Sequence, residues 1–202
     1  MEKPLTIFYT GGLRGDLALL PRLHTFLRAL RAELVPAGEQ ALLFDLGEAC
    51  APGVWHCDVT GGRSALLALD ALGCDAARAD GLSAEDRSRL DANLLRLFPV
   101  NADHPWRAGD VCACAPPSAR LAGCRLCVAL EAAPATALDG HTLRLQGVRA
   151  GEVGTARIGP GPALLAASVH LLPAGTLPDA TIAAVVDFVL DEARRYAQRG
   201  SA

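Results

Sequence analysis

Four cysteines in two close pairs have the residue type and spacing to hold a metal ion. Cys112 and Cys114 are separated by one residue, and Cys124 and Cys127 by two. Four thiolates arranged in this way can bind zinc or an iron–sulfur cluster. The second pair lies in "GCRLCVAL", which is typical of a strand, and residues three apart on a strand face opposite sides. Buried cysteine is also an ordinary small apolar side chain, so we favour core packing and keep a metal-stabilised module as an alternative.

Two glycine-rich stretches have the composition of anion-binding loops. "GGLRG" (11–15) and "TGGRS" (60–64) each precede an expected helix, where backbone N–H groups can cradle a phosphate. Arg14 and Arg63 lie in these stretches, and guanidinium groups suit phosphate or carboxylate. Neither stretch has the lysine of a Walker-type loop. Gly12, Arg14 and Arg63 are therefore the candidate residues of an anion pocket.

The first half of the chain alternates between apolar runs and helical periodicity. Strands are expected at 5–9, 41–46, 74–79 and 98–102. Helices are expected from about Leu20, over 61–73 with Gly73 as the C-terminal cap, and after Ser83, which forms a capping box with Asp86. This alternation predicts an α/β sheet of mostly parallel strands within residues 1–103.

The second half of the chain has a different pattern. From about 109 to 175, short β-like runs are broken by glycine and proline, which predicts hairpins. After "LPD", an apolar face that includes Ile182, Val186 and Val189 predicts a final helix. No stretch reads as a linker, so we expect a single domain over 1–202.

Composition excludes several classes of protein. The 202 residues are 51% hydrophobic and 20% charged, enough for a sizeable core and unlike a disordered chain. A net charge of -3 gives no field to attract nucleic acid or an anionic membrane. The start lacks the pattern of a secretory signal, and no run is long enough to span a bilayer. Seven cysteines without the spacing of a disulfide scaffold predict free thiols in a reducing, cytoplasmic setting. Cys50 and Cys57 flank an expected loop, where they could bind a metal or react, but we favour a bystander role.

The order and spacing of four motifs resemble the calcineurin-like metallophosphoesterase superfamily, in its 5′-nucleotidase branch. There the first strand runs into T-N-D-L-H-G, and here it runs into "TGGLRG". "FDLGEA" occupies the place of the family's L-D-x-G-D pattern, and "ADGLS" that of its G-N-H-E motif. "FPVNAD" occupies the place of a strand that ends in Ala-Asn in the family. The resemblance covers roughly 5–103 and 141–196. It implies an αββα sandwich whose β-rich second half is followed by a C-terminal helix.

The same resemblance implies a dinuclear metal site, yet the matching positions are altered. Gly12 stands where the first loop supplies aspartate, and Arg14 where it supplies histidine. Glu48 replaces the bridging aspartate with a longer carboxylate. Gly81 and Leu82 stand at the asparagine and histidine positions of the third motif. Glycine has no ligand atom and a fixed cation repels a metal ion, so three loops have lost ligands.

A fourth loop of the family is largely missing. Gly140-His141-Thr142 is either a remnant of its G-H-x-H loop or an ordinary turn, and Leu143 occupies the second histidine position. Only Glu48 and His141 remain as possible ligands from the family pattern. Two such ligands do not make a dinuclear site.

These observations lead to three hypotheses. The leading one is a degenerate, non-catalytic binding or assembly module that takes a protein partner or a small anionic ligand, with no cofactor. The first alternative is an active phosphoesterase that uses manganese, zinc or iron on Asp45, Glu48 and His141. The second is a zinc- or iron–sulfur-stabilised module built on the four cysteines from Cys112 to Cys127.

Overall fold

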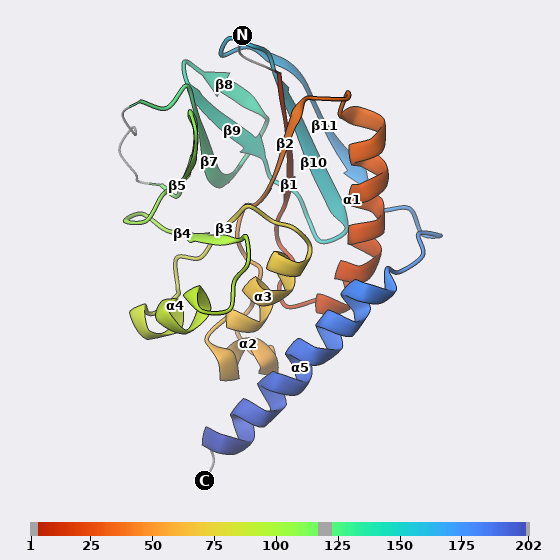
Figure 1. Ribbon diagram of the computed structural model, residues 1–202, viewed down its shortest axis with the longest axis vertical. Helices are drawn as coiled ribbons and strands as arrows, with labels where there is room; N and C mark the ends of the chain where they lie inside the picture. Colours follow the sequence, from red (N-terminus) through yellow and green to blue (C-terminus); the bar gives the residue numbers. More distant parts are fainter. Residues whose placement is uncertain (1–3, 117–122, 201–202) are drawn as a thin grey trace.

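The computed structural model describes residues 4–116 and 123–200 and contains two β-sheets (Figure 1). Strands of the first sheet are Leu5–Thr10 (β1), Gln40–Asp45 (β2), Ala76–Arg78 (β3), Phe98–Val100 (β4), Glu152–Ile158 (β10) and Leu164–Leu171 (β11). Strands of the second sheet are Trp106–Ala108 (β5), Val111–Cys114 (β6), Leu126–Ala133 (β7), Ala137–Asp139 (β8) and Thr142–Gln146 (β9). The helices are Leu17–Leu19 (η1, a 3₁₀ turn), Leu20–Leu34 (α1), Trp55–Thr60 (α2), Arg63–Ala71 (α3), Ala84–Asp91 (α4) and Ala180–Gly200 (α5).

The first sheet has the order β11-β10-β1-β2-β3-β4. Strands β1 to β4 are all parallel, as the alternation of strands and helices predicts. The late strand β10 joins the other edge of β1 in the antiparallel sense, and β11 forms a hairpin with it. Strand β1 is therefore central, and all six of its residues are buried.

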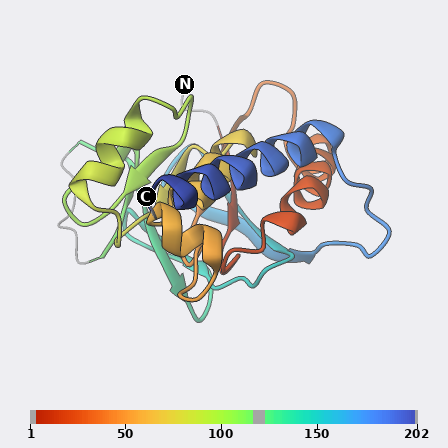
Figure 2. The same cartoon turned by 90° about the horizontal axis from the view of Figure 1, so that it is seen from below.

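Helices cover one face of this sheet. The apolar stripe of α1 (Leu20, Leu23, Leu27 and Leu30) packs with residues of α3 and α5 over Phe8 and Leu43 of the sheet. Helix α5 lies across α1, α2 and α3 (Figure 2) and buries Ile182, Val186 and Val189, the face expected from its periodicity. The helical layer and its core therefore follow the pattern of apolar residues.

The second sheet packs on the opposite face of the first. Its order is β5-β6-β7-β9-β8, and its inner face, with Val128 and Leu143, forms a second core with Ile7 and Phe44. The hairpins expected here occur as β5–β6 and β8–β9. Pairing of β6 with β7, and of β7 with β9, is parallel, so the hairpin prediction is wrong at those two places. Two sheets with a helical layer and a C-terminal helix confirm the predicted α/β sandwich.

Local signals in the sequence match the observed element ends, with one exception. The Ser83 hydroxyl accepts a hydrogen bond from the backbone N–H of Asp86, which begins α4. Gly73 adopts φ +85° after α3, the left-handed backbone that glycine tolerates. The segment between Cys50 and Cys57, expected to be a loop, contains the start of α2. Among the helices of residues 4–116 and 123–200, none is both long and apolar enough to cross a membrane.

Candidate binding cavity

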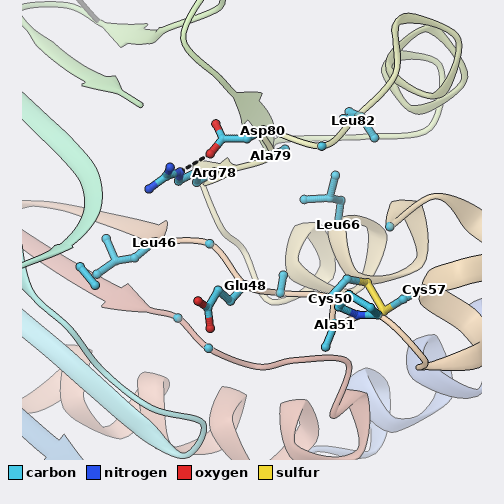
Figure 3. A pocket seen from close by; sticks show the side chains of 18 of the residues that line it. Leu46, Glu48, Cys50, Ala51, Cys57, Leu66, Arg78, Ala79, Asp80 and Leu82 are labelled. Atoms are coloured by element: carbon cyan, nitrogen blue, oxygen red, sulfur yellow. Dashed lines mark hydrogen bonds and ion pairs between the residues drawn. A yellow bond between two sulfur atoms is a disulfide. The ribbon is translucent and has the colours of Figure 1, made fainter. Parts of the chain in front are cut away.

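A cavity of about 750 Å³ opens at the carboxyl ends of the parallel strands (Figure 3). Loops after β1, β2 and β3 line it, together with the end of β7 and Val148. The remaining lining comes from 50–52 and from α2 with the glycines that follow it. Ligands of parallel α/β sheets commonly bind at this edge. The fold therefore places a cavity where a ligand is expected.

Backbone hydrogen bonds join the loops that follow β1 and β2. The N–H groups of Gly12, Arg14 and Gly15 donate to the carbonyl oxygens of Gly47, Glu48 and Ala49 at 3.0, 2.7 and 2.8 Å. Gly12, Arg14 and Glu48 all have positive φ, at +63°, +51° and +55°. A left-handed backbone conformation is unusual for arginine and glutamate. The hydrogen bonds between the two loops hold Arg14 and Glu48 in that conformation.

Carboxylates dominate the charge around the cavity. Among the residues that the structure describes, Glu48, Asp58, Asp80 and Glu131 line it, and Arg78 is the one basic residue of the lining. The Arg78 guanidinium binds Asp80 at 2.5 Å and donates to the carbonyl of Leu130 at 3.3 Å, which links the two sheets. Asp58 accepts a hydrogen bond from the backbone N–H of Gly53. Within residues 4–116 and 123–200, the carboxylates of Glu48 and Glu131 have no hydrogen-bond or ion-pair partner.

Of the residues expected to bind an anion, only Gly12 lines this cavity. Arg14 is exposed on the loop but lies outside the lining. Arg63 forms an ion pair with Asp86, and its guanidinium stacks on Tyr196 of α5 with 4.9 Å to the ring centroid. It borders a separate hollow of about 120 Å³. The structure therefore does not bring Arg14 and Arg63 together with Gly12.

The three residues of the active-enzyme alternative also lie apart. Asp45 is fully buried at the end of β2 and lies outside the cavity lining. His141 is exposed at the start of β9, where its Nδ1 lies 2.9 Å from the carbonyl oxygen of Arg125. Because β9 runs parallel to β7, His141 lies beside Cys127, whereas the cavity borders the far end of β7 at Glu131. Only Glu48 of the three lines the cavity.

Asp45 instead has a structural environment. Its carboxylate accepts hydrogen bonds from the Thr10 hydroxyl at 2.8 Å and from the backbone N–H of Gly47 at 2.9 Å. Burial raises the pKa of this carboxyl to about 6, and the two hydrogen bonds offset part of that rise. The residue thus ties the end of β1 to the turn after β2.

The four cysteines of the zinc or iron–sulfur alternative gather on the outer face of the second sheet. Cys112, Cys114 and Cys127 form a buried cluster, and the half-buried Cys124 packs against it. Cys124 lies before the first residue of β7, so the alternation of a strand does not govern it. Sγ of Cys114 lies 3.0 Å from Sγ of Cys127, and all four thiols are free. Hydrogen bonding to Cys112, together with burial, raises the pKa of the Cys127 thiol to about 12.

A different group has its donor atoms closer together. In residues 4–116 and 123–200, one set of three potential metal ligands has all its donor atoms within 4.8 Å of one another: Cys50, His56 and Cys57. Cys50 and Cys57 are joined by a disulfide, so the expectation of free thiols is wrong for this pair. The short helix α2 brings their Cα atoms to 5.7 Å, within the range that a disulfide spans. The cytoplasmic location, which rested partly on free thiols, stays a prediction.

Comparison with known proteins places this geometry in context. No protein-family model matches the sequence, and no curated protein matches it. Among solved structures, the sulfate thiohydrolase SoxB of Thermus thermophilus superimposes with a TM-score of 0.61 at 13% identity, over 93% of this chain. NAD nucleotidase of Haemophilus influenzae gives 0.62 at 9% identity over 95%, and a 5′-nucleotidase precursor of Thermus thermophilus gives 0.58 at 12% over 98%. The fold resembles 5′-nucleotidase-like phosphoesterase domains. The chain spans about 60% of the length of each of these proteins.

The sequence predicts the loops after β1 and β2 at the site, but of the five charged residues of the lining it indicates only Glu48. Arg78 is the last residue of β3, Asp80 follows it, and Asp58 lies in α2. Glu131 lies near the end of β7. Placing Glu131 at the cavity requires the parallel direction of β7, because only a parallel β7 brings its carboxyl end to the cavity.

Proposed function

We propose that this protein is a non-catalytic, metallophosphoesterase-like binding module whose cavity holds a small molecule with a positively charged group. The observation that supports the proposal is the lining of the cavity. A volume of about 750 Å³ is kept at the strand ends, while glycine and leucine occupy positions where the superfamily has metal ligands. The fold provides a space of ligand size, but Gly12, Gly81 and Leu82 offer no side-chain atoms that bind hard metal ions at the positions where the family has ligands.

Two loops carry this argument. Gly12 and Gly81 both line the cavity and neither has a side chain that can bind a metal ion. Leu82 lines the same wall and replaces a further ligand with an apolar surface. Among the lining residues at metal-ligand positions of the family pattern, Glu48 keeps a carboxylate. A two-metal phosphoesterase needs several such ligands around both ions.

The charge of the lining supports a cationic ligand. Glu48 and Glu131 both line the cavity, and neither carboxylate has a hydrogen-bond or ion-pair partner among the described residues. An amine or guanidinium placed between them would gain two favourable charge interactions. The anion pocket expected from Arg14 and Arg63 is not part of the proposal, because both guanidinium groups lie outside the cavity.

Calorimetric titration with spermidine should detect binding to the wild-type protein at low ionic strength. The double variant Glu48→Gln/Glu131→Gln keeps the shape of both side chains but removes two charges, so we expect the affinity to fall about 10-fold. Higher salt should weaken binding to the wild type. Glu33→Gln is the matched control, since Glu33 is exposed on α1 outside the cavity. Tighter binding of AMP or inorganic phosphate than of spermidine would instead support the anion pocket.

The absence of catalysis is a separate prediction. With added manganese, the purified protein should hydrolyse bis-p-nitrophenyl phosphate no faster than manganese alone. The outcome that would overturn it is stoichiometric metal together with turnover that Glu48→Gln abolishes. Such a result would leave the spermidine experiment to decide the ligand independently.

A further inference from the structure

The wall of the cavity contains a pair of half-cystines next to a histidine. Cys50 and Cys57 both line the cavity, and Figure 3 shows their disulfide among the lining side chains. Sγ of Cys57 lies 3.7 Å from Nδ1 of His56. Donor atoms around a tetrahedral zinc ion lie roughly 3.5 Å apart. The distance between Cys57 Sγ and His56 Nδ1 is thus close to that between two ligand atoms of one zinc ion.

Hydrogen bonding fixes the tautomer of His56 in the form that a metal ligand needs. Its Nε2 lies 3.0 Å from the carbonyl oxygen of Gly15, an acceptor, so Nε2 carries the proton. Nδ1 therefore presents a lone pair. Metal-binding histidines commonly donate their other ring N–H to a backbone carbonyl in this way, which fixes the ring orientation.

Ser64 shares the lone pair of Nδ1 in the disulfide form. Its hydroxyl lies 2.8 Å from Nδ1 and can also donate to the carbonyl oxygen of His56 at 3.2 Å. A metal on this lone pair displaces the hydroxyl, so the Ser64 side chain must rotate away from Nδ1, and the carbonyl oxygen of His56 is an alternative acceptor within its reach. The imidazole is itself almost fully buried, at 4% exposure, and its Nδ1 lies beside the Cys57 sulfur of the disulfide.

We propose that reduction of the Cys50–Cys57 disulfide creates a zinc site in the cavity wall, with Cys50, Cys57 and His56 as ligands. Two thiolates and an imidazole suit zinc better than hard cations such as magnesium or calcium. Cys50 is half-buried on the cavity side, so the fourth coordination position opens into the cavity. Three protein ligands with one open position are typical of zinc sites that bind a further ligand.

The redox step requires an external dithiol. A thiolate of that dithiol attacks one sulfur of the disulfide and releases the other as a thiolate, which gives a mixed disulfide. The second thiolate of the reductant then attacks the reductant's own sulfur in the mixed disulfide. This breaks the bond to the protein cysteine, which is released as a thiolate, and the reductant leaves as a cyclic disulfide. Cys50 and Cys57 end as two thiols after gaining two electrons and two protons. Zinc binding displaces both protons, and oxidation by a disulfide reverses the sequence.

The test compares one protein in two redox states under anaerobic conditions. The oxidised form keeps the Cys50–Cys57 disulfide and five free cysteines, and alkylation with mass spectrometry verifies this state. Zinc or cobalt is then titrated into the oxidised and the reduced protein. We expect the reduced form to bind one molar equivalent more, with a thiolate-to-cobalt charge-transfer absorption. Because the Cys112, Cys114, Cys124 and Cys127 cluster is reduced in both states, it cancels in the difference.

Variants assign the extra equivalent to these residues. Cys50→Ser and His56→Gln should each abolish it, whereas Cys124→Ser, which alters the other cluster, should leave it intact. Equal metal binding by the two redox states would overturn the proposal without any variant, and so would an extra equivalent that persists in Cys50→Ser. The titrations need no cavity ligand, so their outcome is independent of the spermidine experiment.

Discussion

Replacing Gly154 with alanine should unfold the protein or lower its free energy of unfolding by at least about 3 kcal/mol. Gly154 is the antiparallel partner of Tyr9 across β1 and β10. A Cβ atom at this position would overlap three carbons of the Tyr9 ring. Tyr9 is fully buried, and its hydroxyl lies 3.2 Å from Oγ1 of Thr136, so the ring cannot turn away cheaply.

Urea denaturation measures this loss, with Gly161→Ala as the matched control. Gly161 lies in the exposed turn between β10 and β11, and an added Cβ there would meet no atom within 4 Å. In the background of Tyr9→Ala, the Gly154 substitution should cost less than about 1 kcal/mol, because the ring that it overlaps is gone. An equal cost in both backgrounds would disprove the steric explanation.

Replacing Asp45 with asparagine should stabilise the protein at pH 8 and have little effect near pH 4. Asparagine can keep the hydrogen bond from Gly47 N–H on its oxygen, and its amide can donate to the Thr10 hydroxyl in place of the bond that Thr10 now donates. It removes the cost of burying a charge. The folded-state pKa of about 6 compares with an unfolded value of 3.8, and that difference corresponds to about 3 kcal/mol.

The sign of the pH dependence follows from the direction of the shift. Between pH 3.8 and about 6, the folded protein binds this proton more tightly than the unfolded chain does. The contribution of Asp45 to stability therefore falls as pH rises through that window, and the full cost is present above it. Urea denaturation of wild type and variant at several pH values measures the gap between them. A gap that does not change with pH would refute the account, and Asp139→Asn, at an exposed position of β8, is the control.

Local patterns were sufficient to predict most of the helical layer and the first four strands. The leucine stripe of α1, the Ser83 cap and the apolar face of α5 each depend on residues close in sequence, so the sequence alone indicates them. Pairing between β7 and β9 depends on contacts between distant residues, and short β-like runs cannot reveal whether they pair in the parallel or antiparallel sense. The hairpin prediction is wrong for β6–β7 and β7–β9 for that reason.

The candidate site was only partly accessible from sequence for the same reason. Gly12 and Glu48 follow strands that the sequence predicts, so their place at the strand ends could be inferred. Glu131 reaches the cavity through the parallel course of β7, and Cys57 reaches Cys50 through a helix of six residues. A helix that short has too few turns for its periodicity to be recognised. His141 matched a family motif by composition, yet its strand places it at the other end of the sheet.

The backbone pairing between the loops after β1 and β2 has a consequence for affinity. Three N–H···O=C bonds between the loops after β1 and β2 fix the part of the cavity rim that carries Gly12 and Glu48 before any ligand arrives. The conformational entropy of those loops is therefore lost during folding, not during binding. A preorganised rim leaves more of the interaction energy to appear as affinity. This cavity can in that way bind a small molecule without a metal ion to order its loops.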